Sequence, residues 1–327
     1  MRYHVSSHLD PNERASVNRL LAEVERIDRR PALSDHLRLD LRGGGDDGFI
    51  AVVAHNTSGN DSGDDRTGES AAVVAYAQAS PANDVLVVEM ALGSAARGDS
   101  SAIGTSLIEQ LVEAYADRGG GPLNWWIHGN ASLREVAERL GFAETRRLFQ
   151  MRMALPAERE VSVATRSFVV GQDEAEWVRV NNRAFAGHGE QGGWTTSTLR
   201  LRESEDWFDP GGFRVHERDG RMAAFCWTKV HVPTAYEPDH IGEIYVIAVD
   251  PDFHGLGLGS QLTLAGLDHL ARIGITTAIL YVDAANSTAV SMYERLGYEI
   301  HATSTAHHLE IPTEPPPAAD ASSEMTP

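Results

Sequence analysis

Residues 246–260, VIAVDPDFHGLGLGS, decide the fold of this chain. An apolar run stops at Asp250-Pro251, and alternating glycines at 255, 257 and 259 lead into residues 260–273, where leucines recur at helical spacing. Glycines between a strand and a helix let backbone N–H groups approach an anion, which the positive end of the helix also attracts. The stretch therefore predicts a strand, an anion-binding loop and a helix within an α/β layer.

The spacing of the three glycines restricts which anion the loop can hold. A dinucleotide-binding fingerprint needs G-x-G-x-x-G, which strict alternation does not match, and a Walker A loop needs a lysine that does not follow Gly259. The pattern that remains is Q/R-x-x-G-x-G/A, with His254 first and Gly257 and Gly259 in the glycine positions. Such a loop can turn successive amides toward one pyrophosphate. A glycine-rich turn without a ligand is the alternative.

The segment around this loop has a counterpart in the first half of the chain. The segment from LVVEMAL to ASLREVAERLGF in the first half matches the segment from IYVIAVD to STAVSMYERLGY in the second. Asn130 and Arg139 recur as Asn286 and Arg295, with an offset of 156 at both points. An offset that stays constant across about 45 residues is typical of an internal repeat. The sequence therefore predicts two copies of one domain.

The repeat predicts an α/β fold with a mixed sheet in each of two tandem domains. We expect an N-terminal domain at residues 1–155 and a C-terminal domain at residues 160–311, with a seam within LPAERE near residues 155–159. The acidic, Ser/Gly-rich residues 55–70 lie between two strand-like runs and predict a long hairpin loop, and the Pro/Ala-rich residues 312–327 predict a disordered tail.

Composition excludes several classes of protein. A net charge of −19 argues against a general binder of nucleic acid or anionic membranes, because both need a basic surface. Cys226 is the single cysteine, which excludes an internal disulfide and a cysteine-based zinc site; its apolar neighbours favour a buried thiol over a nucleophile. His188 has no second ligand at a suitable spacing, so we expect no metal. The N-terminus has no apolar signal core and no run reaches membrane-spanning length, so we expect a cytoplasmic protein.

The loop and the segment that follows it resemble a known superfamily. IAVDPDFHGLGLGS followed by LYVDAANSTAVSMYERLGYEI is similar to the GNAT N-acetyltransferases, whose Q/R-x-x-G-x-G/A loop binds the pyrophosphate of acetyl-CoA; His254 stands where those enzymes have Gln or Arg. Almost the whole chain also resembles the actinobacterial two-domain GNAT family that acetylates the cysteinyl amine of desacetylmycothiol. This closer resemblance is carried by RVNNRAFAGHGEQGGWT (179–195), DWFDPGGF (206–213), WTKVH (227–231) and NWWIHG (124–129).

The resemblance implies roles for residues of the second copy. Glu243 would be the general base, acting through water, and Tyr293 the general acid toward the coenzyme A thiolate; a solvated carboxylate and a core tyrosine are the alternatives. Acetyl-CoA would be bound by Ile247, Ala248, Val249, His254, Gly255, Leu256, Gly257, Leu258, Gly259, Ser260, Asn286, Ser287, Thr288, Ala289, Val290 and Ser291. The substrate would be contacted by Asp35, Glu190, Lys229, Glu243 and Tyr281, with Gln191 beside Glu190 on a glycine-flanked loop.

The first copy lacks this acid–base pair. Leu86 stands at the position of Glu243, and Ala137 stands at the position of Tyr293. Its loop, ARGDSSAIGT, is stretched and has no alternating glycines, although Arg97 matches His254 with an offset of 157. We therefore expect a catalytically silent N-terminal domain. By resemblance it can still hold a CoA-type ligand at Met90, Ala91, Leu92, Arg97 and Gly98.

Three functions are consistent with the sequence. The first is an acetyl-CoA-dependent N-acetyltransferase that forms mycothiol by direct attack of a small-molecule amine. The second is a tandem GNAT enzyme for another small-molecule or peptide amine, and the third is a non-catalytic acyl-CoA-binding sensor. The presence of Glu243 and Tyr293 in one copy favours an enzyme, and the HGEQGGWT and WTKVH runs favour the cysteinyl acceptor. We expect a monomer, because the tandem repeat supplies the pairing that many single-domain GNAT proteins obtain by dimerising.

Overall fold

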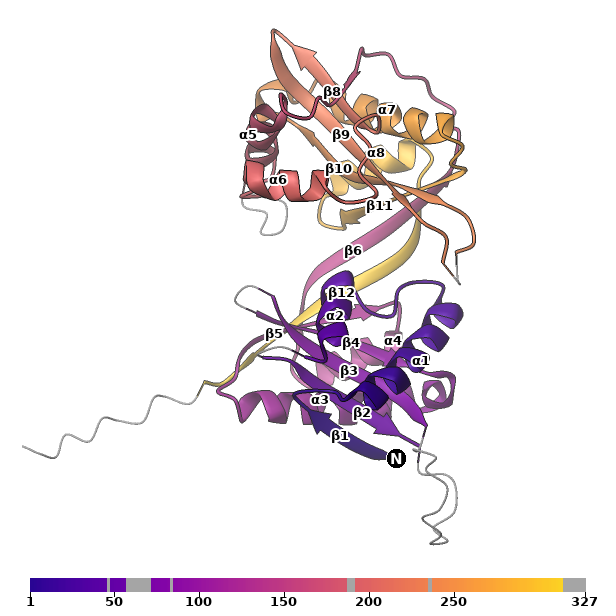
Figure 1. The fold of residues 1–327 in the computed structure, drawn as a ribbon, viewed down its shortest axis with the longest axis vertical. Helices are drawn as coiled ribbons and strands as arrows, with labels where there is room; N and C mark the ends of the chain where they lie inside the picture. Colours follow the sequence, from indigo (N-terminus) through magenta and orange to yellow (C-terminus); the bar gives the residue numbers. More distant parts are fainter. Residues whose placement is uncertain (46–47, 57–71, 83–84, 187–191, 235–236, 314–327) are drawn as a thin grey trace, which may run out of the picture. The chain divides into compact units, whose positions relative to one another are not determined.

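The computed structural model describes residues 1–45, 48–56, 72–82, 85–186, 192–234 and 237–313 (Figure 1). The chain forms two compact units, residues 1–146 with the chain from 305 onward, and residues 147–304. Nearly all of the 55–70 segment and of the 312–327 tail lies outside the described residues, as do Glu190 and Gln191. None of the helices in the described ranges is both long and apolar enough to cross a membrane.

The first unit is a mixed sheet with helices on both faces. Strands β1 to β4 pair antiparallel in sequence order, and β4 pairs parallel with β5. Its elements are β1 (Arg2–Ser6), α1 (Pro11–Asp28), α2 (Asp35–Gly43), β2 (Ile50–His55), β3 (Val73–Ala82), β4 (Val85–Leu92), the 3₁₀ helix η1 (Ser94–Asp99), α3 (Ser100–Ala116), β5 (Gly121–His128) and α4 (Ala131–Arg139).

The alternation of buried residues along β2 explains why both faces are covered. Ile50 and Val52 belong to the apolar cluster beneath α3 and α4, while Ala51 and Val53 belong to the cluster beneath α1 and α2. Successive side chains of a strand point to opposite faces, so a strand that is buried throughout needs a layer of helices on each side. Helix α1 begins at a capping box in which Asp10 accepts from the backbone of Glu13.

The second unit repeats this plan. Its strands follow the order β7-β8-β9-β10-β11-β6, in which the β10–β11 pair is parallel and the others are antiparallel. Its elements are β6 (Ala143–Ala154), β7 (Arg166–Ser167), α5 (Glu174–Ala184), α6 (Thr196–Glu203), β8 (Phe213–Arg218), β9 (Arg221–His231), β10 (Ile241–Val249), the 3₁₀ helix η2 (Pro251–Phe253), α7 (Leu258–Arg272), β11 (Thr277–Asp283), α8 (Ser287–Arg295) and the start of β12 (Glu299–Ile311). The predicted mixed α/β fold in two copies is confirmed.

Two strands lie in the unit of the other copy. From residue 148 onward β6, the last strand of the first copy, pairs with β11 in the second unit. Residues 305–311 of β12, the last strand of the second copy, belong to the first unit, where the His308 imidazole Nδ1 lies 2.8 Å from the Asn124 side-chain oxygen. The sequence places the domain boundary at residues 155–160, whereas the compact units divide after residues 146 and 304.

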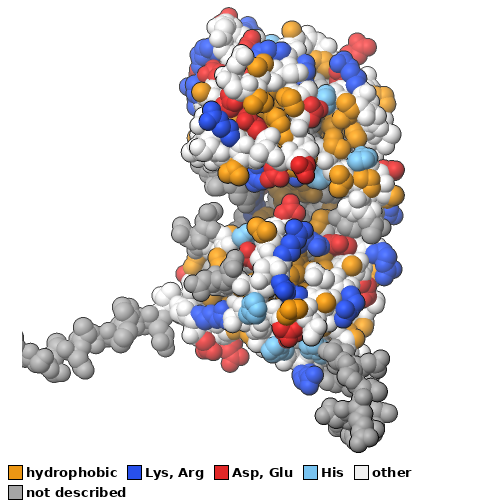
Figure 2. Space-filling model, viewed as in Figure 1, with side chains coloured by type: hydrophobic (Ala, Val, Ile, Leu, Met, Phe, Trp, Pro, Cys, Tyr) orange, Lys and Arg blue, Asp and Glu red, His pale blue; other side chains and the backbone are white. Residues whose placement is uncertain are grey.

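Side chains of both charges are interspersed over the face shown in Figure 2, although the net charge is −19. The Cys226 thiol has no exposed surface and lies in the core between β9 and α7, and burial raises its pKa to about 12. A thiol with so high a pKa stays protonated at neutral pH, so Cys226 is a core residue rather than a nucleophile.

Candidate active site

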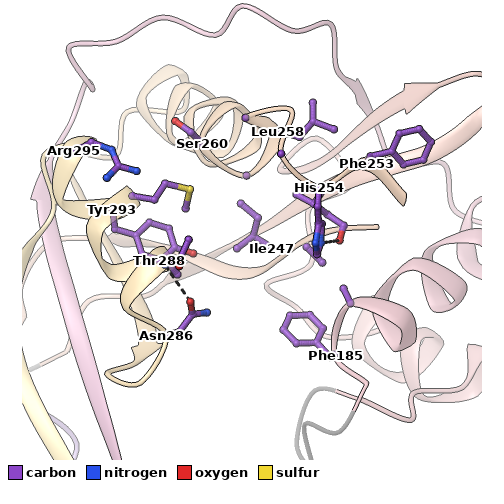
Figure 3. A pocket seen from close by; sticks show the side chains of 18 residues that line it. Phe185, Ile247, Phe253, His254, Leu258, Ser260, Asn286, Thr288, Tyr293 and Arg295 are labelled. Atoms are coloured by element: carbon purple, nitrogen blue, oxygen red, sulfur yellow. Dashed lines mark hydrogen bonds between the residues drawn. The ribbon is translucent and has the colours of Figure 1, made fainter. Parts of the chain in front are cut away.

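A cavity of about 550 Å³ opens in the second unit, where β10 ends and α7 begins (Figure 3). Four elements contribute to its wall: the last residues of β10, the glycine loop with the start of α7, one face of α8, and the end of α5. The lining residues are Ala184, Phe185, Ile247, Ala248, Val249, Phe253, His254, Gly255, Gly257, Leu258, Gly259, Ser260, Asn286, Thr288, Ala289, Met292, Tyr293 and Arg295.

The glycine loop gives the cavity a cluster of unpaired backbone donors. Gly255 and Gly257 adopt left-handed conformations, with φ of 78° and 73°, which other residues reach only at a cost of about 1–2 kcal/mol. Gly257 is the N-cap of α7, and no side chain caps this end of the helix. The amides of the first helical turn, at Leu258, Gly259 and Ser260, therefore point out of the helix toward the cavity, where the helix dipole adds positive potential. This geometry suits a pyrophosphate.

A separation of two parallel strands gives the cavity its second feature. Among the described residues, β10 pairs with β11 only at Gly242 with Ala278 and at Glu243 with Ile279. The ladder between β10 and β9 has a bulge between Ile244 and Val246 and then continues to Val249. Past the bulge, the edge of β10 that faces away from β9 pairs with no strand among the described residues, although the Val249 carbonyl accepts from His254. An extended chain with amide groups, such as pantetheine, can bond to this edge as an added strand.

A buried aspartate anchors the start of the loop. Asp250 has no exposed surface, accepts from the backbone N–H of Asp252 at 3.0 Å, and forms ion pairs with Arg179 at 2.5 Å and Arg183 at 3.2 Å. Burial raises the pKa of Asp250, but the Asp252 amide and the Arg179 guanidinium outweigh this effect and hold it below its usual value. Both arginines come from α5, which explains why the end of that helix lines the cavity.

Side chains around the loop are held by bonds to the backbone. The His254 ring nitrogen Nε2 lies 3.1 Å from the carbonyl oxygen of Val249, and since a carbonyl only accepts, this nitrogen carries the proton. Asn286 is the N-cap of α8, where its side-chain oxygen accepts from the amide of Ala289 at 3.1 Å (Figure 3). Asn286 therefore orients the helix face that lines the cavity.

Most residues predicted to bind acetyl-CoA line this one cavity. The exceptions are Leu256, which is half exposed, and Ser287, Val290 and Ser291 on the remaining faces of α8. Sequence reasoning missed Ala184, Phe185, Phe253, Met292 and Arg295. Met292 could have been found, because it follows Thr288 by four residues and so lies on the same helix face. The sequence carries no local signal that the end of α5 reaches the loop.

Tyr293 lies in the cavity wall and is nearly buried, with 6 % of its surface exposed. Its ring packs edge-on against Tyr298, with the ring centroids 5.8 Å apart. Burial raises the pKa of the Tyr293 phenol well above its ordinary value of 10. The phenol therefore stays protonated throughout the neutral range, so it can donate a proton.

The predicted substrate contacts of the second unit that lie in the described residues share one face of its sheet. Lys229 lies directly opposite Glu243 in the antiparallel register, Glu243 lies beside Ile279 in the parallel register, and Tyr281 follows Ile279 by two residues. Because alternate residues of a strand face the same way, the side chains of Lys229, Glu243 and Tyr281 project to the same side. Glu243 is 8 % exposed and precedes Ile247 by four residues, about 13 Å along an extended strand.

The surroundings of these three side chains differ. The Lys229 ammonium lies over the rings of Trp207 and Tyr245, at 4.9 and 5.6 Å from their centroids, which stabilises the cation. Tyr281 is 49 % exposed, and its hydroxyl accepts from the Gln150 side-chain amide at 2.7 Å. Asp35 is exposed in the first turn of α2 in the first unit. The described residues contain no group of three or more His, Cys, Asp or Glu suited to a metal ion.

The corresponding loop of the first unit is built differently. None of its glycines is left-handed, and it forms the 3₁₀ helix η1 before α3 starts. Arg97 forms an ion pair with Asp28 of α1 at 2.7 Å, and Glu23 of α1 accepts from both the amide and the hydroxyl of Ser94, at 2.8 and 2.6 Å. The other predicted cofactor contacts there are Met90, Ala91 and Leu92, which are buried in β4, and Gly98 in η1. Leu86 and Ala137 are buried apolar residues at the positions of the acid–base pair.

Comparison with known proteins agrees with this geometry. The Acetyltransferase (GNAT) family model matches residues 177–298. A GCN5-related N-acetyltransferase from Sphaerobacter thermophilus superposes with a TM-score of 0.69 at 20 % identity, covering 95 % of this chain and 96 % of that one. A tandem GNAT protein from the clavulanic acid biosynthesis pathway superposes with a TM-score of 0.63 at 14 % identity, covering 96 % and 100 %. The fold and the site define a tandem-domain GNAT acyltransferase.

Sequence relatives narrow the family further. A mycothiol acetyltransferase from Frankia alni is 39 % identical over 302 residues, covering 88 % of this chain and 89 % of the relative. A mycothiol acetyltransferase from Geodermatophilus obscurus is 41 % identical over 308 residues, covering 90 % and 93 %. The chain belongs to the mycothiol acetyltransferase family.

Proposed function

We propose that this enzyme transfers the acetyl group of acetyl-CoA to the cysteinyl amine of desacetylmycothiol, a cysteinyl-glucosaminyl-inositol, to give mycothiol by direct attack. The observation that carries the reaction class is the combination of an anion-binding cavity with the buried carboxylate of Glu243 upstream on the same strand. The acceptor is supported by similarity to mycothiol acetyltransferases along about nine-tenths of the chain. The cavity and Glu243 lie in the second unit, and the similarity to the relatives extends across that unit.

Residues of the cavity fit acetyl-CoA, which supplies a thioester-bound acetyl group when it is bound. The amides of Leu258, Gly259 and Ser260 would hold the pyrophosphate, and the edge of β10 at residues 247–249, which pairs with no described strand, would bond the pantetheine arm. Apolar side chains such as Phe185 and Met292 would cover the arm and exclude water. Leu256, Ser287, Val290 and Ser291 are adjacent in the sequence to residues that line the cavity, and we propose them as further cofactor contacts on that ground.

Glu243 would act as the general base. An α-amine is largely protonated at neutral pH, and only its neutral form has a lone pair for attack. The Glu243 carboxylate, nearly buried and acceptor-only, would take a proton from the amine directly or through one water. Lys229 and Tyr281 project from the same face and would contact the polar sugar and inositol, with Glu190 and Asp35 as further substrate contacts.

Tyr293 would act as the general acid. Its phenol remains protonated because burial raises its pKa, and it lines the cavity that would hold the acyl donor. Transfer of the phenolic proton to the departing thiolate would give the thiol. The nitrogen, having lost one proton to Glu243 before attack, would lose its second after attack to the Tyr293 phenolate, and Glu243 would release its proton to solvent.

The first unit would be non-catalytic. Apolar Leu86 and Ala137 replace the acid–base pair, and the ion pair between Arg97 and Asp28 engages the arginine that would otherwise meet a phosphate. We propose that Met90, Ala91, Leu92, Arg97 and Gly98 bind a CoA-type ligand more weakly than the second unit does. We further propose that the enzyme works as a cytoplasmic monomer without a metal.

Thiol release with a panel of amines tests this function. Purified protein is incubated with acetyl-CoA and the cysteinyl-glucosaminyl-inositol acceptor, and in parallel with puromycin-like and peptide amines, with the acceptor's own thiol subtracted. We expect turnover of the cysteinyl acceptor alone. Turnover of another amine without the inositol acceptor would refute the acceptor, and binding of acetyl-CoA without turnover of any amine would favour a sensor.

A further inference from the structure

A histidine outside the predicted site contacts the carboxylate of Glu243. The His231 ring nitrogen Nε2 lies 2.6 Å from Glu243 Oε2. His231 is the last residue of β9 and lies opposite Ile241, so it is the diagonal neighbour of Glu243 on the same face of the sheet. Among the described residues, this imidazole is the sole ion-pair partner of Glu243.

The cross-strand register leads one to expect a different partner. Lys229 lies directly opposite Glu243, the arrangement in which opposite charges normally pair. The Lys229 ammonium instead lies over the aromatic rings of Trp207 and Tyr245. The geometry thus keeps the lysine available for a ligand and leaves the imidazole to hold the carboxylate.

The chemistry of the two groups fixes the direction of the bond. An ionised carboxylate has only acceptor atoms, so Nε2 of His231 must carry the proton and donate it. One lone pair of Oε2 is then engaged, whereas His231 leaves Oε1 free to accept a proton from an amine. A glutamate side chain has several rotatable bonds, and a short charge-assisted bond restricts them to one orientation.

We infer that His231 is the positioning residue of the general base: it donates Nε2–H to Oε2 of Glu243 and so directs Oε1 toward the acceptor amine. This inference rests on the proposed function, because it takes Glu243 as the base. His231 has 38 % of its side chain exposed, whereas Glu243 has 10 %, so the bond joins the nearly buried base to a partly exposed residue. A core-packing role does not need so exposed a ring.

Substitutions at residue 231 separate a donor from a mere space filler. His231→Leu removes the donor, His231→Gln keeps an N–H at a similar reach, and His240→Gln is the matched control on an exposed histidine nearby. Loss of a hydrogen bond to a charged group corresponds to about a ten- to hundredfold change in rate. We expect kcat of His231→Leu to fall by about this factor, His231→Gln to stay within about threefold, and KM for acetyl-CoA to remain unchanged in all three. Full kcat in His231→Leu, or an equal loss in His231→Leu and His231→Gln, would overturn the inference.

A second measurement keeps this result distinct from the identity of the acceptor. Nitrogen-15 NMR of the imidazoles reports which ring nitrogen carries the proton, and His231→Gln assigns the signal by its disappearance. We expect an Nε2-protonated His231 in the wild type and a shifted resonance in Glu243→Gln. An Nδ1-protonated His231, or no response to Glu243→Gln, would refute the bond even if the enzyme acetylates desacetylmycothiol. Failure of the wild type to use that acceptor would instead refute the proposed function and leave the NMR result standing.

Discussion

Substitution of Gly257 by alanine tests whether the glycine loop holds the pyrophosphate. Gly257 has φ of 73°, and a Cβ added there would meet nothing within 4 Å, so the effect of the methyl group is purely conformational. A left-handed alanine costs about 1–2 kcal/mol, which corresponds to a factor of about 5 to 30. If the free loop keeps its shape, this cost lowers the free energy of unfolding. If the free loop relaxes, binding must restore the shape, and the same factor weakens the affinity for coenzyme A.

The conformational cost of the left-handed alanine is divided between the free energy of unfolding and the affinity for coenzyme A, so both must be measured. Isothermal titration calorimetry gives Kd for coenzyme A, and urea denaturation gives the free energy of unfolding; together the changes should amount to about 1–2 kcal/mol. Gly220→Ala is the matched control, because Gly220 also has positive φ (72°), has nothing within 4 Å of an added Cβ, and lies in the turn between β8 and β9. The control should lose stability and keep its Kd. The reasoning is refuted if Gly257→Ala changes neither quantity, or if Gly220→Ala weakens coenzyme A binding equally.

Three further predictions follow from individual contacts. Tyr293→Phe should lower kcat by about a hundredfold or more in a thiol-release assay. Burial raises the pKa of the Tyr293 phenol in the fold, so its contribution to the free energy of unfolding is complete below pH 10 and is lost as the pH rises further. The unfolding free energy of the variant should therefore fall less than that of the wild type between pH 9 and 11. Arg97→Ala should leave kcat and KM unchanged and alter the unfolding free energy by less than about 1 kcal/mol, since its partly exposed ion pair with Asp28 is of the weak kind. Cys226 should resist aromatic disulfide reagents in the native protein and react once it is denatured, because burial raises its pKa to about 12.

The sequence predicted well what depends on local pattern. The alternating glycines specified a loop whose conformations only glycine adopts readily, and the predicted helix at 260–273 is observed at Leu258–Arg272. The repeated Asn130 and Asn286 both proved to be N-caps, at α4 and α8. These features rest on short-range chemistry, which a sequence states directly.

Contacts between distant segments were not predictable in this way. The bond between His231 and Glu243 joins residues twelve apart on two strands, and it depends on the register of β9 against β10. The strands β6 and β12 gave no sign that each lies in the unit of the other copy, since a strand has the same alternating pattern whichever sheet it joins. The end of α5 reaches the cavity through the ion pairs of Asp250, a partner about seventy residues away.

The difference between the two copies lies in what occupies the N-terminal end of each central helix. In the second copy, α7 starts from a left-handed glycine and has no side-chain cap, and the nearby Asp250 carboxylate is neutralised by arginines. In the first copy, Asp99 stands at the N-cap of α3, and α1 brings Glu23 and Asp28 to the preceding 3₁₀ helix. Neither helix has a side-chain cap, but in the first copy Glu23 bonds the Ser94 amide and Asp28 holds Arg97, and these carboxylates beside the helix end repel a second negative charge. One copy thus keeps its helix end available for a ligand, while the other uses the same position to fix its own fold.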